Sequence, residues 1–355
     1  MRSIPTNFLK GSEVLGETLY TSKGHMLVKE GTLLTELLIK KINTNKIYTV
    51  YIHDEHCDNQ INRIIDQSLR LQGIEIIREL FTLAAKNKDI LVAHNKLSDY
   101  ADDVLYETST IRNQQIEYID IKNLDDYLYS SSLNTAILSI LIARQANVPR
   151  DMIKQIFFGA IYHDIGLAMI PPEVINKNSE LTIDEKMMIL MHPKKGHEFL
   201  KSKTYLSAYV KAITLQHHEH MDGSGYPNRK KHDEIHLYAH IVGIADIYDA
   251  MTSDKPYKMA VSPNEAIEYI TSTAGSHFPL DITEIFAKKI NPYPVGSLVL
   301  LSKNMHAVVD KVHDGFPLRP SVRIINKVAG KYEYIPLNLM ENNSILIEKM
   351  IYSLE

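Results

Sequence analysis

The chain has only one cysteine, Cys57, and no tryptophan among its 355 residues. A lone cysteine excludes an internal disulfide framework and suits a reducing compartment, so we expect a cytoplasmic protein. It is also more often a buried or neutral thiol than a metal ligand. Imidazole and carboxylate side chains are therefore the candidates for binding any metal.

Long apolar runs and a strong charge imbalance are also missing. No run reaches the ~18 residues that a membrane-spanning helix needs. The longest run, residues 136–143, has the length of a core helix segment, and the first residues lead into no stretch typical of a signal peptide. The formal net charge is −4, so no global attraction favours DNA, RNA or anionic lipid. We therefore expect no membrane span and no nucleic-acid partner.

The hydrophobic pattern divides the chain into four predicted segments. Residues 1–58 alternate short apolar runs with turn signals, which predicts a small α+β module. Its predicted elements are a strand at 19–20, a turn at 21–24, a strand at 26–28, a helix over 33–42 and a strand over 47–52. Apolar residues then recur at three- and four-residue steps over 59–121, which is typical of a helical connector or a dimerising stalk, so a homodimer through this segment is expected.

Residues 122–290 continue the helical pattern with more apolar residues, and residues 291–355 show short β-type runs separated by Gly, Asn and Pro. The predicted fold is mainly α, with an all-helical core, a small α+β N-terminal module and a small β-rich C-terminal appendage. Within the core segment, Thr182 and Glu185 form a capping-box pattern that opens a helix. The stripe of Met187, Met188 and Met191 on that helix is expected to pack in the core.

Nine of the sixteen histidines crowd the middle of the chain, between His163 and His240. His163-Asp164 is a vicinal pair that follows the apolar stretch 157–162. Such a pair offers an imidazole to one metal and a carboxylate that can bridge to a second. Two ions ~3.5–4 Å apart suit the in-line displacement of a phosphoryl group.

Further candidate ligands follow in order: His192, the pair His217-His218, and Asp246. Each one taken alone is more often an ordinary core or surface residue. Their sequence contexts together form a specific series: His163-Asp164-Ile165-Gly166, Met191-His192-Pro193, His217-His218-Glu219, Gly225-Tyr226-Pro227 and Asp246-Ile247-Tyr248-Asp249-Ala250.

This series resembles the HD-GYP subgroup of the HD-domain phosphohydrolases. The resemblance covers about residues 123–286, with further likeness over 293–299. It implies an HD-domain fold and a metal-dependent phosphodiesterase that hydrolyses cyclic di-GMP, or a related cyclic dinucleotide, in bacterial second-messenger signalling.

The resemblance also implies roles for the ordered residues. His163, Asp164 and Asp246 would hold a first divalent metal, with Asp164 bridging to the second metal and His163 and Asp164 as the catalytic pair. His192, His217 and His218 would complete the second metal site. Iron or manganese is the implied metal, and imidazole–carboxylate ligation suits either ion.

Two further segments are implied to bind the ligand. Asp222, Gly225, Tyr226 and Pro227 belong to the loop that faces the substrate, where the glycines permit close backbone approach. Lys255 and Lys258 fall where the family places basic residues that contact the phosphates. The family often has arginine at the first of these positions, and lysine keeps the charge without the bidentate fork.

The chain departs from the family pattern at two positions. Ser131 stands where the family places a metal-binding histidine, and Leu167 replaces the lysine of the His-Asp-x-Gly-Lys motif. Serine is a poor ligand for such metals, and the lost lysine removes charge stabilisation near the phosphate.

Three interpretations therefore stay open: an active cyclic-dinucleotide phosphodiesterase, a weak or inactive domain that binds the nucleotide and signals, and a phosphohydrolase for another phosphorylated substrate. The Gly-Tyr-Pro loop and the two lysines argue against the third.

Overall fold

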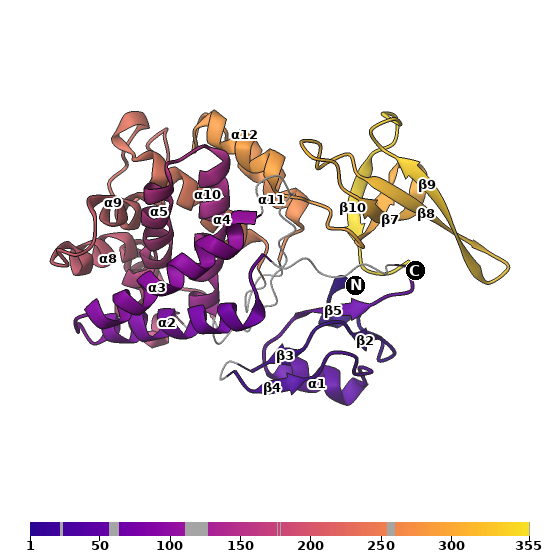
Figure 1. Cartoon of the computed structure of the whole chain (residues 1–355), viewed down its shortest axis with the longest axis horizontal. Helices are drawn as coiled ribbons and strands as arrows, with labels where there is room; N and C mark the ends of the chain where they lie inside the picture. The colour runs from indigo at the N-terminus through magenta and orange to yellow at the C-terminus, as the bar shows by residue number, and fades with distance from the viewer. Residues whose placement is uncertain are drawn as a thin grey trace.

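The computed structural model describes residues 1–21, 24–56, 64–110, 127–175, 177, 179–253 and 260–354. A helical unit forms the largest part, and two small β-containing units are built from the two ends of the chain (Figure 1). The predicted fold class, mainly α with an α+β N-terminal module and a β-rich C-terminal appendage, is confirmed. The proposed segment boundaries at 58, 121 and 290 stay predictions. In the described part of the chain, no helix is both long and apolar enough to span a bilayer.

The N-terminal unit folds around a three-stranded antiparallel sheet in the order β1-β5-β2, with β3 and β4 as a separate hairpin. Helix α1 begins at Glu36 rather than 33 because the Thr35 hydroxyl accepts a hydrogen bond from the Leu38 amide and caps the helix. The elements are β1 Arg2–Pro5, β2 Val14–Leu15, β3 Leu19–Tyr20, β4 Met26–Val28, α1 Glu36–Thr44 and β5 Thr49–His53.

Helices α2, Gln67–Ala85, and α3, Leu91–Glu107, fall in the predicted helical connector. Their apolar faces join the main hydrophobic cluster. Helix α2 packs on α4, Tyr127–Gln145, and α3 packs on α5, Arg150–Tyr162. The connector helices are thus in contact with the helices that carry the candidate chemistry. Dimerisation through this segment stays a prediction.

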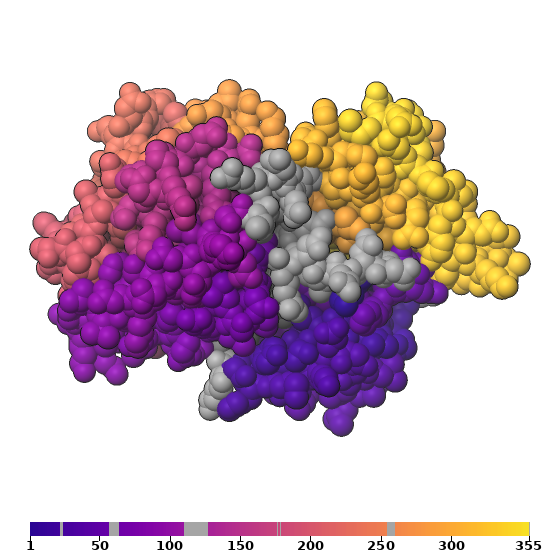
Figure 2. Space-filling model, in the orientation of Figure 1, coloured from indigo at the N-terminus to yellow at the C-terminus, as the bar shows by residue number. Residues whose placement is uncertain are grey.

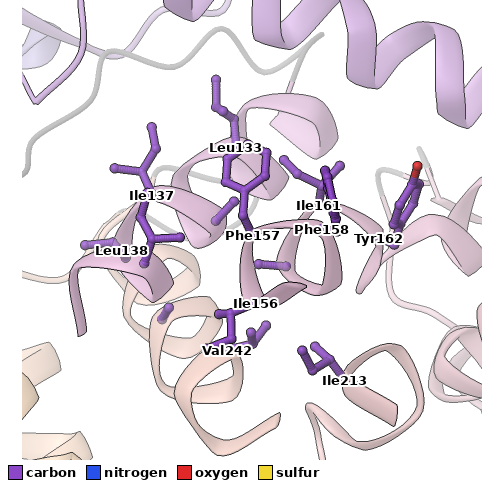
Figure 3. Packing of buried hydrophobic residues seen from close by; sticks show 14 of the residues in the cluster. Leu133, Ile137, Leu138, Ile156, Phe157, Phe158, Ile161, Tyr162, Ile213 and Val242 are labelled. Carbon is purple, nitrogen blue, oxygen red and sulfur yellow. The ribbon is translucent and has the colours of Figure 1, made fainter. Parts of the chain in front are cut away.

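Helix α4, Tyr127–Gln145, lies at the centre of the helical unit and is buried on all sides from Ser130 to Ala143. A helix that is apolar all round belongs inside a bundle. Accordingly, α4 packs against α2, α5, α10 (Leu237–Met251) and α12 (Leu280–Lys289). In Figure 3, Leu133 of α4 lies next to the ring of Phe157 of α5. Ile137 of α4, Ile213 of α9 (Ala208–Gln216) and Val242 of α10 belong to the same cluster. This packing fixes the relative positions of the helix ends at which the candidate ligands lie.

The remaining helices surround α4 and α5. Helix α9 packs on α5 and α8, and α10 packs on α4 and α9. Their bounds are α5 Arg150–Tyr162, α6 Pro172–Ile175, α7 Ile183–Leu190, α8 His192–Lys201, α9 Ala208–Gln216, α10 Leu237–Met251, α11 Pro263–Ser272 and α12 Leu280–Lys289.

Helix α7 has the predicted capping box, in which Thr182 and Glu185 satisfy each other's backbone amides. The expectation that its methionines pack in the core is wrong. Met187 is 54% exposed and Met188 is 42% exposed, and no residue of α7 is buried. Helical spacing alone predicted an apolar face but could not show that the short α7 lies at the surface of the bundle.

The C-terminal unit is a five-stranded antiparallel sheet in the order β10-β6-β7-β8-β9. The four predicted β-type runs, 298–301, 307–309, 322–325 and 332–335, all lie within its strands. These strands are β6 Leu298–Leu301, β7 Met305–Lys311, β8 Ser321–Val328, β9 Lys331–Asn338 and β10 Ile347–Ile351.

The two small units contact each other, and Figure 2 shows them next to one another beside the helical unit. Arg2 pairs with the buried carboxylate of Asp54 and donates a 3.3 Å hydrogen bond to the Tyr352 carbonyl. The His56 Nδ1 lies 2.7 Å from the Tyr334 hydroxyl, and Arg323 donates to the His56 carbonyl at 3.0 Å. Residues from the two ends of the sequence therefore share one buried polar interface.

A buried histidine of α10 leads to a prediction about acid stability. Burial lowers the pKa of His240 from 6.5 to about 4, and His220 adds a smaller repulsion. The folded protein therefore keeps this imidazole neutral, whereas the unfolded chain protonates it near its ordinary pKa. Its stabilising contribution is complete above pH 6.5 and is lost as the pH falls toward 4.

The wild type should lose free energy of unfolding between pH 6.5 and pH 4, and we expect His240→Leu to reduce that loss by up to ~3 kcal/mol at pH 4. The free energies are measured by urea unfolding across this pH range. The exposed His25→Gln serves as the control. Parallel curves for the wild type and the His240 variant would contradict this assignment.

Candidate metal centre

His163 lies at the carboxyl end of α5, where helical carbonyls have no amide partner within the helix. Its Nδ1 lies 2.6 Å from the Ala160 carbonyl oxygen, so Nδ1–H donates to that oxygen. A neutral imidazole carries only one proton, so the Nε2 atom then presents a lone pair. His163 is fully buried, and its Nε2 points toward Asp164 and Asp246.

The same arrangement recurs at two other helix ends. His192, just after α7, donates from Nδ1 to the Ile189 carbonyl at 2.8 Å. His217, which caps α9, donates from Nδ1 to the Thr214 carbonyl at 3.1 Å. Each ring contacts the carbonyl three residues before it, and each keeps Nε2 as the acceptor atom. Second bonds of this kind fix the ring orientation and tautomer of metal-binding histidines.

These lone pairs converge on the Asp164 carboxylate. His163 Nε2 lies 3.1 Å from Asp164 Oδ2, and His192 Nε2 lies 3.0 Å from Asp164 Oδ1. His217 Nε2 is 3.9 Å from the same Oδ1. On the other side, Asp246 Oδ1 is 3.5 Å from His163 Nε2, and Asp246 Oδ2 is 3.9 Å from His218 Nδ1.

The structure thus brings together all six residues that the sequence singled out as metal ligands. They form two groups of potential ligand atoms, each within 4.8 Å of one another. One group contains His163, Asp164 and Asp246, and the other contains Asp164, His192, His217 and His218. Asp164 belongs to both groups, as a bridging carboxylate must. Ligation of metal by these residues stays a prediction.

Two observations test whether a cation suits this site. His192 Nε2 and His217 Nε2 lie 3.2 Å apart, although both rings have their proton on Nδ1, so two lone pairs face each other. The buried Nε2 of His163 is close to Asp164 but makes no well-directed hydrogen bond among the described residues. A cation between these atoms would satisfy them all, so the donor set fits divalent metal.

The electrostatics favour the same conclusion. Burial opposes a positive charge on His163, but Asp164 and Asp246 outweigh it, so the pKa of His163 is raised well above its ordinary value. Burial and the neighbouring imidazoles lower the pKa values of His217 and His218 well below the ordinary value. Burial disfavours an Asp164 charge, yet His163 and His192 lower the pKa of this carboxyl. The site therefore combines an ionised Asp164 with the neutral imidazoles of His217 and His218, which is the state that binds metal. On His163 the two carboxylates favour a second proton, and a cation bound at Nε2 would take the place of that proton.

Close backbone approach holds the His163-Asp164 turn against α8. A Cβ atom at Gly166 would lie 2.0 Å from the His192 carbonyl oxygen, which no side chain permits. The glycine of this motif is thus required so that the segments carrying Asp164 and His192 can touch. Leu167 follows it in the short helix η4, Ile165–Met169, where its side chain is half-buried.

The predicted substrate loop folds directly over the histidine pair. The ring of Tyr226 stacks on His218 with centroids 4.6 Å apart. A Cβ at Gly225 would lie 2.4 Å from the His218 carbonyl oxygen, so only glycine fits there. Pro227 follows in a cis peptide bond, and Asp222 accepts a 2.8 Å hydrogen bond from the Ser224 amide. Lys255 and Lys258 lie outside the described residues, so their predicted phosphate contacts stay predictions.

Glu219 is a residue of this loop that the sequence reasoning did not single out. Its carboxylate is buried and accepts hydrogen bonds from the amides of Asn228, at 2.7 Å, and Lys230, at 2.9 Å. It thereby ties residues 228–230 to the segment that carries the candidate ligands His217 and His218. In the sequence, its position directly after His217-His218 could have indicated that it lies near the site.

Ser131, at the position of the missing family histidine, donates a 2.6 Å hydrogen bond to Asp249 Oδ2. Asp249 is buried and also accepts from Asn134 Nδ2 at 3.0 Å, while Arg70 of α2 donates to Asn134 Oδ1 at 2.6 Å. Because Asp249 follows Asp246 by three residues, it lies on the same face of α10. Ser131 thus connects α4 to a carboxylate near Asp246, one of the candidate metal ligands.

Tyr127 is a second residue that the sequence reasoning missed. Burial raises the pKa of its phenol strongly, and the negative charges of Asp249, Asp246 and Asp164 raise it further. Because the charges of all three carboxylates act on this phenol, it lies close to the site. Its raised pKa means that it stays protonated at neutral pH. In the sequence, only its position one helical turn before Ser131 could have indicated that it lies near the site.

Comparisons with known proteins identify the family and the fold. Residues 112–282 match the family model of the HD domain, and residues 298–355 match a KOW domain associated with the HD domain. An HD-GYP-type protein of solved structure from Bdellovibrio bacteriovorus, at 16% identity, has the same fold with a TM-score of 0.50, covering 81% of this chain and 98% of that one. The central part of the chain therefore belongs to the HD domain family, and the resemblance to the HD-GYP subgroup is confirmed.

Curated relatives extend the comparison. The chain is 32% identical over 252 residues to a cyclic di-GMP phosphodiesterase of Pseudomonas aeruginosa, covering 71% of this chain. It is 31% identical over 228 residues to a cyclic di-GMP phosphodiesterase of Thermotoga maritima, covering 63% of this chain. In both cases the match spans 60% of the length of the relative.

The paired geometry predicts how metal content responds to mutation. Replacing His217 and His218 together with alanine removes two of the three imidazoles around Asp164 in one group and should lower the bound metal by about one ion per chain. Metal content is measured by mass spectrometry on anaerobically purified protein. His232→Gln, an exposed histidine of the same region, is the matched control. Equal metal content in the double variant and the wild type would contradict the ligand assignment.

Proposed function

We propose that this chain is a metal-dependent phosphodiesterase that hydrolyses cyclic di-GMP, or a related cyclic dinucleotide, in bacterial second-messenger signalling in the cytoplasm. The observation that carries the proposal is the position of Asp164, whose Oδ2 faces His163 in one candidate group and whose Oδ1 faces His192 in the other. Such a carboxylate suits a two-metal site for phosphoryl chemistry. The names of the curated relatives supply the substrate class.

His163, Asp164 and Asp246 would hold one divalent ion, and Asp164, His192, His217 and His218 the other, with iron or manganese matching the donor set. When bound, such a metal pair supplies Lewis acidity and water activation for an in-line displacement at phosphorus. The side chains themselves orient these groups, because each anchored imidazole is fixed in one tautomer.

The neighbouring loop would bind the ligand. Tyr226 covers one face of His218, and burial together with Asp164 raises the pKa of its phenol, so the hydroxyl stays protonated and can donate to a phosphate oxygen. Asp222 and Gly225 would shape the backbone of this loop, and Pro227 would end it. Lys255 and Lys258 would neutralise the phosphates, as the sequence resemblance implies.

A second candidate function has a specific observation in its favour. Ser131 is committed to Asp249 and supplies no imidazole, and Leu167 supplies no cation. A domain with these two changes would bind a cyclic dinucleotide and signal through the contacts of α2 and α3 with the core, with weak or no hydrolysis.

The first test of function is turnover. We expect the metal-loaded protein to linearise cyclic di-GMP and Asp164→Asn to lower the rate roughly 100-fold or more, because the neutral amide weakens both metal groups. His232→Gln should leave the rate unchanged. Product is followed by chromatography. Tight nucleotide binding with no product from metal-replete wild type would support the signalling module instead.

The second test addresses the two departures. Ser131→His adds an imidazole from α4, and Leu167→Lys places a cation beside Asp164, where the half-buried position lets the ammonium reach solvent. We expect the double variant to bind more metal and to turn over faster than the wild type. Because Ser131→His removes the hydrogen bond to Asp249, folding is checked by circular dichroism first. Rapid wild-type turnover with no gain in a folded double variant would show that other residues compensate.

A further inference from the structure

A further group of side chains that could bind a metal ion lies outside the site described above. His220, Asp222 and His277 each offer one ligand atom, and these atoms lie within 4.8 Å of one another. None of the three belongs to the two groups around Asp164. Two imidazoles and one carboxylate form the donor set that zinc and similar borderline cations prefer.

Backbone hydrogen bonds already hold the three residues together. The Met221 amide donates to the His277 carbonyl at 3.1 Å, and the Asp222 amide donates to the Ser276 carbonyl at 2.9 Å. The loop that follows α9 is thereby paired with the turn that follows α11. The backbone of the three residues is thus preorganised, and only their side chains have to move when an ion binds.

Atoms for coordination remain available in this group. Asp222 uses Oδ1 to accept the Ser224 amide, and His220 Nδ1 lies 3.0 Å from the Ser224 hydroxyl, which leaves the second oxygen and Nε2. Within the described part of the chain, the buried Nδ1 of His277 has no hydrogen-bond partner. An unpaired buried nitrogen is unfavourable, so the His277 ring gains from any arrangement that gives it a partner.

The two rings also set a requirement for binding. His220 and His277 are stacked, with centroids 3.9 Å apart and planes 10° from parallel. A coordinated metal lies in the plane of each imidazole that binds it, so two stacked rings cannot share an ion without turning. Binding must therefore rotate at least one ring out of the stack and draw the ligand atoms closer than 4.8 Å.

We propose that His220, Asp222 and His277 form an additional, structural site for a divalent cation of the zinc class. The ion joins the loop that carries His218 and Tyr226 to the turn at 273–278, and a water molecule takes the fourth position. The site is separate from the catalytic metals of the proposed function and is independent of whether the protein hydrolyses its ligand.

The experiment titrates the full chain with Zn²⁺ alone, desalts it and measures zinc per chain by mass spectrometry. We expect His277→Gln to bind about one zinc ion fewer than the wild type, while His232→Gln, an exposed histidine nearby, binds the wild-type amount. Asp222→Asn keeps the side-chain shape and should lower zinc affinity in the same way. Equal zinc in the wild type and in folded His277→Gln would overturn the proposal.

Loss of zinc in these variants could also follow from a disturbed fold, so a second experiment looks for a new absorption band instead of a loss of metal. His277→Cys places a thiolate, a good zinc-class ligand, at the same position. Loaded with Co²⁺, this variant should show near-ultraviolet thiolate-to-cobalt absorption, while the wild type, whose only cysteine is Cys57, should not. No such band in a folded, cobalt-loaded His277→Cys would also overturn the proposal. Neither readout depends on nucleotide hydrolysis, so failure here is distinguishable from failure of the proposed function.

Discussion

The candidate centre depends on one repeated interaction, the hydrogen bond from an imidazole Nδ1–H to a carbonyl at a helix end. His163, His192 and His217 each make it to the residue three positions earlier. Helix C-termini leave carbonyls that need donors, and here the donors are the same rings that the site needs. One interaction thus satisfies the helix and fixes which nitrogen faces inward. Packing of α5, α9 and α10 around α4 then decides where those nitrogens meet.

The sequence predicted much of this because the motif residues are chemically distinctive and keep their order. The fold class was correct, and the six singled-out ligands lie together. Interactions between segments distant in sequence could not be predicted. No local pattern shows that Ser131 binds Asp249, which lies 118 positions away, or that Tyr127 feels the same carboxylates. The exposure of Met187 was missed for a related reason. Helical periodicity identifies the apolar face of a helix, but it does not show whether another element covers that face.

Ser131 stands where the family has a metal-binding histidine, and it makes a structural hydrogen bond instead. Its hydroxyl joins a chain of hydrogen bonds from Arg70 on α2, through Asn134 on α4, to Asp249 on α10. Buried polar chains of this kind fix the relative positions of the elements that they connect. The first helix of the predicted connector is thereby linked to the helix that carries Asp246. A displacement of α2 would therefore be transmitted to the face of α10 that carries the candidate ligand Asp246.

The contact between Arg2 and Tyr352 has a consequence for how the chain folds. Because residues from both ends of the sequence meet in one interface, the helical unit is topologically an insertion between its two halves. Closing that interface requires contacts across 350 positions, which are slow to form because the loop-closure entropy is large. The helical unit, whose packing is more local, can fold during synthesis before β10 leaves the ribosome. The joint between the small units is therefore expected to be the last part of the molecule to assemble.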